Sequence, residues 1–128
     1  MQHQAPLKKS GGKNAAELRE SIKGAMEAVG SVVRGQSTSI ELVFAAILAR
    51  GHVLLEDVPG VGKTTLARAI ARVLGQSFAR IQFTSDMLPG DVLGMQILDP
   101  ATGQLHFRPG PIMRQVVLAD EINRASPR

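Results

Sequence analysis

The sequence has no cysteine, tryptophan or tyrosine, and only four of its 128 residues are phenylalanine. Without cysteine, the chain cannot form disulfides, thiolate zinc sites or iron–sulfur clusters. The scarcity of aromatic rings leaves few platforms on which nucleic-acid bases stack. The longest apolar run, Leu42 to Ala49, has eight residues, whereas a membrane-spanning helix needs about 20. Since no secretion signal is visible at the N-terminus either, we expect a cytoplasmic protein without a membrane span.

Basic residues exceed acidic ones mainly at the start of the chain. Fifteen Lys and Arg against eleven Asp and Glu give a formal net charge of +4. Three of these lysines lie in residues 1–13, which hold no acidic residue. Such tails are usually solvated, so we expect no nucleic-acid partner. Residues 1–13 are predicted to be a disordered basic tail that precedes one domain at 14–128.

Apolar residues at helical spacing predict two helices in the first part of that domain. Asn14 and Glu17 form a capping-box pattern at the start of the first helix, and Gly30 is the expected stop. A second helix is predicted to begin at Thr38 and to end at Gly51. Its predicted buried residues are Ile40, Val43, Phe44, Ile47 and Leu48.

Strands and a helix then alternate in the order that is typical of a parallel α/β sheet. Buried strands are predicted at His52–Glu56, Phe78–Phe83 and Val116–Ala119. A helix from about Lys63 to Leu74 lies between the first two, with Leu66, Ile70, Val73 and Leu74 expected to be buried. Between the last two strands, Met95–Leu98 and Gln104–Phe107 flank a turn sequence, and they predict a β-hairpin.

The glycine-rich turn between the first strand and that helix has the composition of a phosphate-binding loop, the Walker A motif. Small residues let backbone N–H groups surround a phosphate. Lys63 would contact the β- and γ-phosphates, Thr64 would bind Mg²⁺, and Thr65 would contact the α-phosphate. Asp57 replaces the first glycine of the pattern at a turn position that Asp tolerates. The run comprises Asp57, Val58, Pro59, Gly60, Val61, Gly62, Lys63, Thr64 and Thr65.

Two acidic residues, Asp120 and Glu121, directly follow the last predicted strand. The carboxyl ends of parallel strands form the ligand-binding edge of an open α/β sheet. Asp120 would hold Mg²⁺ through its water shell, and Glu121 would polarise the attacking water. Solvated acids after a strand are common, but downstream of a phosphate-binding loop the pair predicts nucleoside triphosphate hydrolysis. Glu121 and Lys63 are the candidate catalytic residues.

The sequence resembles the MoxR family of AAA+ ATPases, which are P-loop NTPases with a parallel sheet and flanking helices. The resemblance extends from about Asn14 to the last residue. It also accounts for Asp57, because members of this family often lack glycine there. The segments that carry it are residues 51–65, 81–91, 107–111 and 118–127.

This resemblance implies a hexameric, Mg-ATP-dependent and chaperone-like ATPase that helps partner proteins mature, insert metals or assemble. Such proteins often work with a partner that carries a von Willebrand factor A domain. Val33, Gly35 and Gln36 would lie beside the adenine. The hairpin would be a family insert that faces clients or the central pore, or it would only complete the fold. Arg124 could reach a neighbouring subunit or pair locally.

A complete module of this family also has two more strands, a sensor residue, an arginine finger and a helical lid. We therefore expect an N-terminal fragment of a longer protein, truncated after the Walker B strand. In the family's sheet order, the fourth strand lies between the first and the third. Two alternatives stay open: a non-catalytic interaction module or inert subunit, and a P-loop protein of another branch, such as a GTPase. The GTPase is disfavoured because the motif segments given above already fit the AAA+ pattern.

Overall fold

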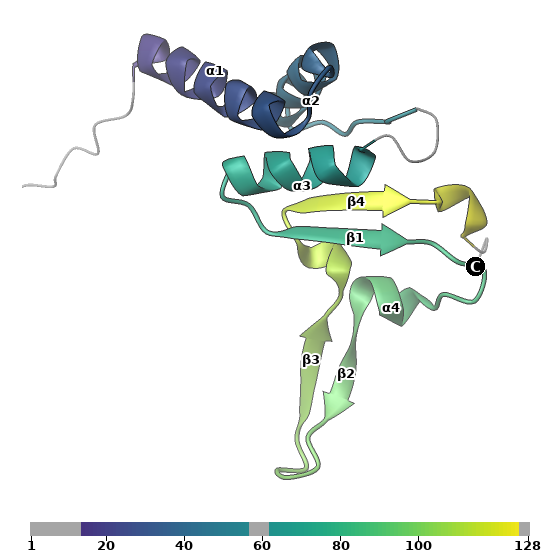
Figure 1. Ribbon diagram of the computed structural model, residues 1–128. Helices are drawn as coiled ribbons and strands as arrows, with labels where there is room; N and C mark the ends of the chain where they lie inside the picture. Colours follow the sequence, from purple (N-terminus) through teal and green to yellow (C-terminus); the bar gives the residue numbers. More distant parts are fainter. Residues whose placement is uncertain (1–13, 57–61, 126–128) are drawn as a thin grey trace, which may run out of the picture.

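The computed structural model describes residues 14–56 and 62–125. Three predictions therefore lie wholly or partly outside the described residues: the tail at 1–13, the segment 57–61 of the phosphate-binding loop, and the end of the resemblance at 126–128. The described chain has a helical layer on a small parallel sheet, and a hairpin projects from the opposite side of that sheet (Figure 1). Within the described ranges, no helix has both the length and the apolar character that crossing a bilayer requires.

The helical layer consists of α1 (Ala15–Val32), α2 (Ser37–Leu48) and α3 (Lys63–Val73). The predicted capping box at the start of α1 is confirmed: the Asn14 side chain accepts a hydrogen bond from the Glu17 N–H at 2.9 Å, and the Glu17 carboxylate accepts one from the Asn14 N–H at 3.1 Å. Apolar side chains of all three helices form one core. It comprises Val29, Val33, Ile40, Phe44, Leu66 and Ile70.

Two helix boundaries differ from the predictions. α1 continues past Gly30 to Val32, because the turn is made by Gly35 at φ 77° instead. Gly30 faces α2, since a Cβ built on it would lie 3.9 Å from the Ile40 Cδ1. α2 begins at Ser37 rather than Thr38, and its N-cap, Gln36, makes no side-chain capping bond.

The sheet is formed by β1 (Phe78–Gln82) and β4 (Val116–Asp120), which run parallel with Phe78 opposite Val116 and Gln82 opposite Asp120. Both strands were predicted, with ends that differ by one residue. α3 contacts the start of β1, where the Arg68 guanidinium is 5.7 Å from the centroid of the Phe78 ring. The parallel pairing and the covering helices confirm the α/β class.

The projecting hairpin is the one predicted from the sequence. A short helix, α4 (Pro89–Leu93), leads into β2 (Gly94–Leu98), which pairs antiparallel with β3 (Leu105–Pro109). The 3₁₀ turn η1 (Pro111–Met113) then returns the chain to β4, and a second one, η2 (Ile122–Arg124), follows β4. Periodicity did not predict α4, η1 or η2, because each is too short to show any.

The predicted first strand, His52–Glu56, is wrong. Residues 51–56 have no regular secondary structure, and Leu54 is 80% exposed. A strand needs a hydrogen-bonded neighbour, and the parallel sheet of the described residues contains β1 and β4 alone. In the sheet order that the resemblance implies, another strand lies between this run and β4, so the run has no adjacent strand. Leu55 nevertheless packs against the helical core.

Two apolar residues that were expected in the core lie on the surface. Leu48 is 60% exposed and Val73 is 38% exposed. Each is the last residue of its helix. Helical spacing therefore assigned these residues to the correct element, but burial depended on what packs against it.

Candidate functional site

The start of α3 has the geometry of a helix that follows a phosphate-binding loop. Gly62 is the N-cap and adopts left-handed angles, φ 66° and ψ 9°, which glycine reaches without strain. Lys63 and Thr64 occupy the first turn and are half-buried, while Thr65 is exposed. The first N–H groups of a helix have no partners within it, and together with the helix dipole they favour an anion. α3 therefore presents a lysine, a hydroxyl and the N–H groups of a helix start at one end.

The connection between α1 and α2 lies beside this helix start. A Cβ built on Gly62 would be 3.7 Å from the Gln36 Nε2, so these two residues are neighbours. Val33 and Gly35, from the same connection, line a cavity of about 290 Å³ between α1 and α2. Val33 is only 6% exposed and belongs mainly to the core. The structure thus brings the segment predicted to lie beside the adenine next to the end of the predicted phosphate-binding loop.

The carboxyl end of β4 carries Asp120, which is paired with Arg80 of β1. The Arg80 Nη2 lies 2.5 Å from the Asp120 Oδ2, and the Arg80 Nε lies 3.2 Å from the same oxygen. The hydrogen bond from Arg80 is the main cause that lowers the pKa of Asp120 below its usual value, against a smaller opposing effect of desolvation. The charges of Arg80 and Lys63 lower this pKa further. Asp120 is therefore an ionised carboxylate within the electrostatic reach of Lys63.

Glu121 follows Asp120 in an unusual backbone conformation. Its φ is 56° and its ψ is 37°, in the left-handed region that residues other than glycine seldom adopt. The Arg124 Nε lies 3.0 Å from its Oε2, and both side chains are substantially exposed. Of the two alternatives for Arg124, the structure shows the local ion pair.

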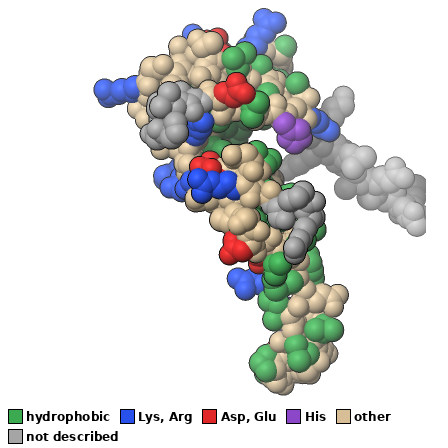
Figure 2. All heavy atoms as spheres, turned by 90° about the vertical axis from the view of Figure 1, so that its right-hand side faces the viewer, with side chains coloured by type: hydrophobic (Ala, Val, Ile, Leu, Met, Phe, Trp, Pro, Cys, Tyr) green, Lys and Arg blue, Asp and Glu red, His purple; other side chains and the backbone are tan. Residues whose placement is uncertain are grey.

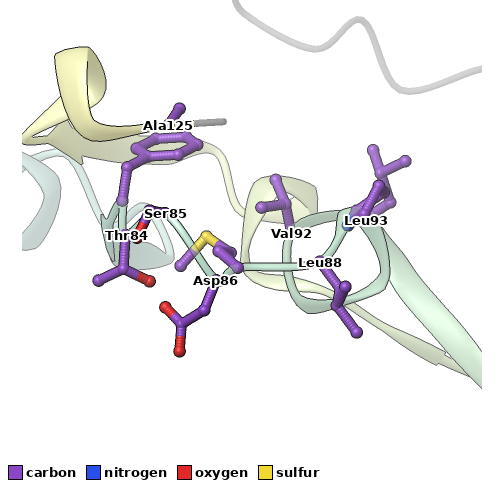
Figure 3. A pocket seen from close by; sticks show the side chains of 10 residues that line it. Thr84, Ser85, Asp86, Leu88, Val92, Leu93 and Ala125 are labelled. Carbon is purple, nitrogen blue, oxygen red and sulfur yellow. The ribbon is translucent and has the colours of Figure 1, made fainter. Parts of the chain in front are cut away.

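A second cavity, of about 300 Å³, lies beyond the end of β1. Its lining comes from the segment that follows β1, from α4 and from Ala125 (Figure 3). The lining is mostly apolar. Asp86 is its one charged residue, and a hydrogen bond with the Thr84 side chain lowers the pKa of that carboxyl. None of the predicted nucleotide-binding residues lines this cavity.

Comparison with known proteins identifies the family. Residues 52–128 match the model of the "ATPase family associated with various cellular activities (AAA)". The uncharacterised protein YeaC of Bacillus subtilis is 52% identical over 112 residues, which cover 88% of this chain and 35% of YeaC. Chaperone MoxR1 of Mycobacterium tuberculosis is 39% identical over 123 residues, which cover 96% of this chain and 32% of MoxR1. The chain belongs to the MoxR family of AAA ATPases.

A solved structure extends this likeness to the fold. The crystal structure of a candidate ATPase from Cytophaga hutchinsonii superposes with a TM-score of 0.75 at 39% identity, over 85% of this chain and 33% of that one. The chain spans about a third of the length of the curated relatives named above. The α/β fold with a parallel sheet and flanking helices is therefore that of an AAA ATPase.

Sequence reasoning missed one residue at the site of this MoxR-family chain. Arg80 is 40 positions from Asp120, and no motif includes it. The register of β1 and β4 brings them together, because Arg80 lies opposite Leu118 and Asp120 is two positions further along the same face. A basic residue on the neighbouring predicted strand was the available signal, but it required the register.

Proposed function

We propose that this chain carries the phosphate-binding and hydrolytic residues of an Mg-ATP-dependent, MoxR-type ATPase. The observation that carries the proposal is the start of α3, where Gly62 is a left-handed N-cap and Lys63 and Thr64 follow in the first turn. Asp120 lies at the carboxyl end of β4, and the charge of Lys63 is among the causes that lower its pKa. Placement at the carboxyl edge of parallel strands is typical of nucleotide sites in α/β proteins.

Each residue has a role that its chemistry allows. Residues 57–62 would surround the phosphates with backbone N–H groups, and Lys63 would neutralise charge on the β- and γ-phosphates. Thr65 would contact the α-phosphate. Val33, Gly35 and Gln36 would lie beside the adenine, which fits the approach of Gln36 to Gly62.

The oxygen donors fit Mg²⁺. Thr64 supplies a hydroxyl in the first turn of α3, and the lowered pKa of Asp120 keeps its carboxylate charged. Hard oxygen ligands of this kind suit Mg²⁺, which retains several waters and usually takes one or two protein carboxylates plus phosphates. Among the residues that the structure describes, no group of three His, Asp or Glu side chains forms a metal site. Bound Mg²⁺ would neutralise the charge that develops on the phosphates.

Glu121 is proposed to be the general base that orients and polarises the attacking water. It is adjacent to Asp120 in the chain and substantially exposed, so water can reach its carboxylate. It pairs with Arg124 through Oε2. A carboxylate in hydrogen-bond reach of water is suited to this role.

For the whole protein, we propose a chaperone-like ATPase that works as a hexamer. The similarity to chaperone MoxR1 supports the chaperone class. The family resemblance supports the hexamer and, as its partner, a protein with a von Willebrand factor A domain. We propose ATP and Mg²⁺ as the cofactors.

The proposal is tested by measuring ATP binding and phosphate release in the full-length protein with Lys63→Ala. We expect the variant to lose detectable binding, because it lacks the charge that faces the phosphates. Lys23→Ala is the matched control, since Lys23 is an exposed lysine on α1. Equal ATP affinity in the wild type and Lys63→Ala would overturn the role of Lys63. Absence of ATP turnover at every protein concentration would favour the non-catalytic interaction module.

A further inference from the structure

Arg80 occupies a position at the proposed nucleotide site that the roles given above do not use. Its guanidinium contacts Asp120 through two nitrogens, Nε and Nη2, and both bonds end on Oδ2. A guanidinium presents its donors in a rigid plane, so two bonds to one oxygen hold that oxygen in place beside the plane's edge. Oδ1 lies outside the two bonds from Arg80.

Both residues of this ion pair lie on paired strands, Arg80 on β1 and Asp120 on β4. β1 and β4 are paired in parallel over five residues, and Arg80 is central in β1. Arg80 and Asp120 lie on the same sheet face, because side chains alternate along the paired strands. The arginine therefore reaches along this face from a rigid element toward the last residue of the neighbouring strand. Elements of this kind hold a side chain more closely than loops do.

The pair contributes little to the stability of the fold. The Arg80 and Asp120 side chains are 41% and 35% exposed, and exposed ion pairs are weak because water screens them. A short, two-donor contact at an exposed place is better explained by the orientation it gives to the carboxylate. Partners that orient a metal-facing carboxylate affect metal affinity strongly even without touching the metal.

We propose that Arg80 is a positioning residue for the Mg²⁺–nucleotide site, which holds the Asp120 carboxylate by Oδ2 in the orientation that Mg²⁺ binding requires. The inference rests on the proposed function, because it takes Asp120 as the carboxylate that faces Mg²⁺. Arg80 acts through Asp120 and touches neither the nucleotide nor the reacting atoms. Its loss should therefore weaken Mg²⁺ binding and leave the binding of metal-free ATP unchanged.

The test is a Mg²⁺ titration of ATP binding in the full-length protein, with ATP binding in excess EDTA measured in parallel. For Arg80→Ala we expect the Mg²⁺ concentration that gives half of the Mg²⁺-dependent ATP binding to rise about tenfold. Arg80→Lys should recover part of this loss, since lysine keeps the charge but offers no fork. Arg108→Ala is the matched control, because Arg108 is an exposed arginine on the projecting hairpin.

A double-mutant cycle separates positioning from a general electrostatic effect. In an Asp120→Asn background, Arg80→Ala should produce no further change in the Mg²⁺ titration. An unchanged titration in Arg80→Ala, tighter Mg²⁺ binding, or an equal loss of ATP binding in EDTA would each overturn the positioning role. If the wild-type protein binds no ATP, the proposed function itself fails. A thermal melt identifies variants that are simply unfolded, and Arg80→Lys then carries the comparison.

Discussion

Glu121 combines an unfavourable backbone conformation with the position proposed for the general base. Its φ of 56° places it in the left-handed region, and the next residues form η2. Such conformations cost about 1–3 kcal/mol and persist where the surrounding structure enforces them, often at functional sites. The turn directs the chain away from β4 directly after Asp120, which keeps the two neighbouring carboxylates at the strand end.

The role of Glu121 leads to a test that separates binding from turnover. Glu121→Gln keeps the size of the side chain but removes the base, so phosphate release should fall by a factor of about 10² to 10⁴. ATP binding should remain at the wild-type level, as measured by titration with a fluorescent ATP analogue. Arg124→Gln serves as the control, because it removes the ion pair and leaves the Glu121 carboxylate in place. Wild-type turnover in Glu121→Gln would contradict the assignment.

Asp120 should titrate below the usual range of an aspartate, chiefly because Arg80 donates hydrogen bonds to it. A pKa that is lower in the folded state means that the pair stabilises the fold above the unfolded value, about 3.9. This contribution is lost as the pH falls through the lower, folded pKa. A carboxyl NMR titration should show the lowered pKa, and Arg80→Ala should raise it. Identical titration curves in the two proteins would show that the pair does not form in solution.

At the scale of elements, the capping box formed by Asn14 and Glu17 stabilises α1 and, through α1, the helical layer. α1 contributes Val29, which is fully buried, to the core that it shares with α2 and α3. Asn14→Ala removes the acceptor for the Glu17 N–H and should lower the free energy of unfolding by about 1 kcal/mol. Urea denaturation measures this change. Asn14→Ser, which keeps a capping oxygen, should lose less, and an equal loss would argue against the cap.

Gly94 is a point at which the hairpin tolerates no side chain. It lies at φ 106°, and a Cβ there would collide with the Arg108 carbonyl oxygen and would lie 2.6 Å from the Gly110 backbone nitrogen. Gly94→Ala should therefore open the β2–β3 ladder, with a cost above about 2 kcal/mol. Hydrogen exchange should show loss of protection in β2 and β3 and its retention in β1 and β4. Gly103→Ala also strains a positive φ, 69°, but a Cβ there meets no neighbouring atom within 4 Å, so the ladder should stay protected.

Local patterns predicted most elements correctly because their causes are local. The capping box at Asn14, the start of α3 at Lys63 and the hairpin each depend on a few neighbouring residues. The buried strand expected at His52–Glu56 was wrong because an apolar run becomes a strand only beside another strand. Leu48 was placed in the correct helix but was expected to be buried, whereas it is exposed, since burial depends on the elements around it.

The candidate site also divides into features that local motifs predict and contacts that depend on how distant strands pair. Lys63, Asp120 and Glu121 could be predicted as site residues because each belongs to a short motif whose chemistry is visible in the sequence. Their expected proximity followed from the rule that the carboxyl ends of parallel strands share one edge. Arg80 could not be found in this way, because its contact with Asp120 depends on the register of two strands that lie far apart in the chain. The register of two strands depends on how they pack, and a single sequence motif does not predict it.

At the scale of the whole molecule, apolar surface is unevenly distributed. Hydrophobic side chains gather along the projecting hairpin (Figure 2). Met95, Leu98, Leu105 and Phe107 are between 48% and 63% exposed there. The register places Leu98, Leu105 and Phe107 on one face of the hairpin and Met95 on the other. Exposed apolar patches often mark interaction sites in soluble proteins. It lies at the end of the molecule opposite α1 and α2, so the proposed nucleotide residues and this surface are separate features of one chain (Figure 1).

The arrangement of the core determines how the 128-residue chain should respond to nucleotide. Its six core side chains connect α3, which begins with Lys63, to α1 and α2, and this links the proposed phosphate site to the main source of stability. We expect a cooperative melt by circular dichroism. A ligand at 100 times its Kd stabilises the folded state by about 2.7 kcal/mol, so Mg-ATP should raise the Tm by several degrees. Lys63→Ala should melt cooperatively without this rise. A broad wild-type transition that Mg-ATP leaves unchanged would show that α3 and the end of β4 do not form a binding site within these residues.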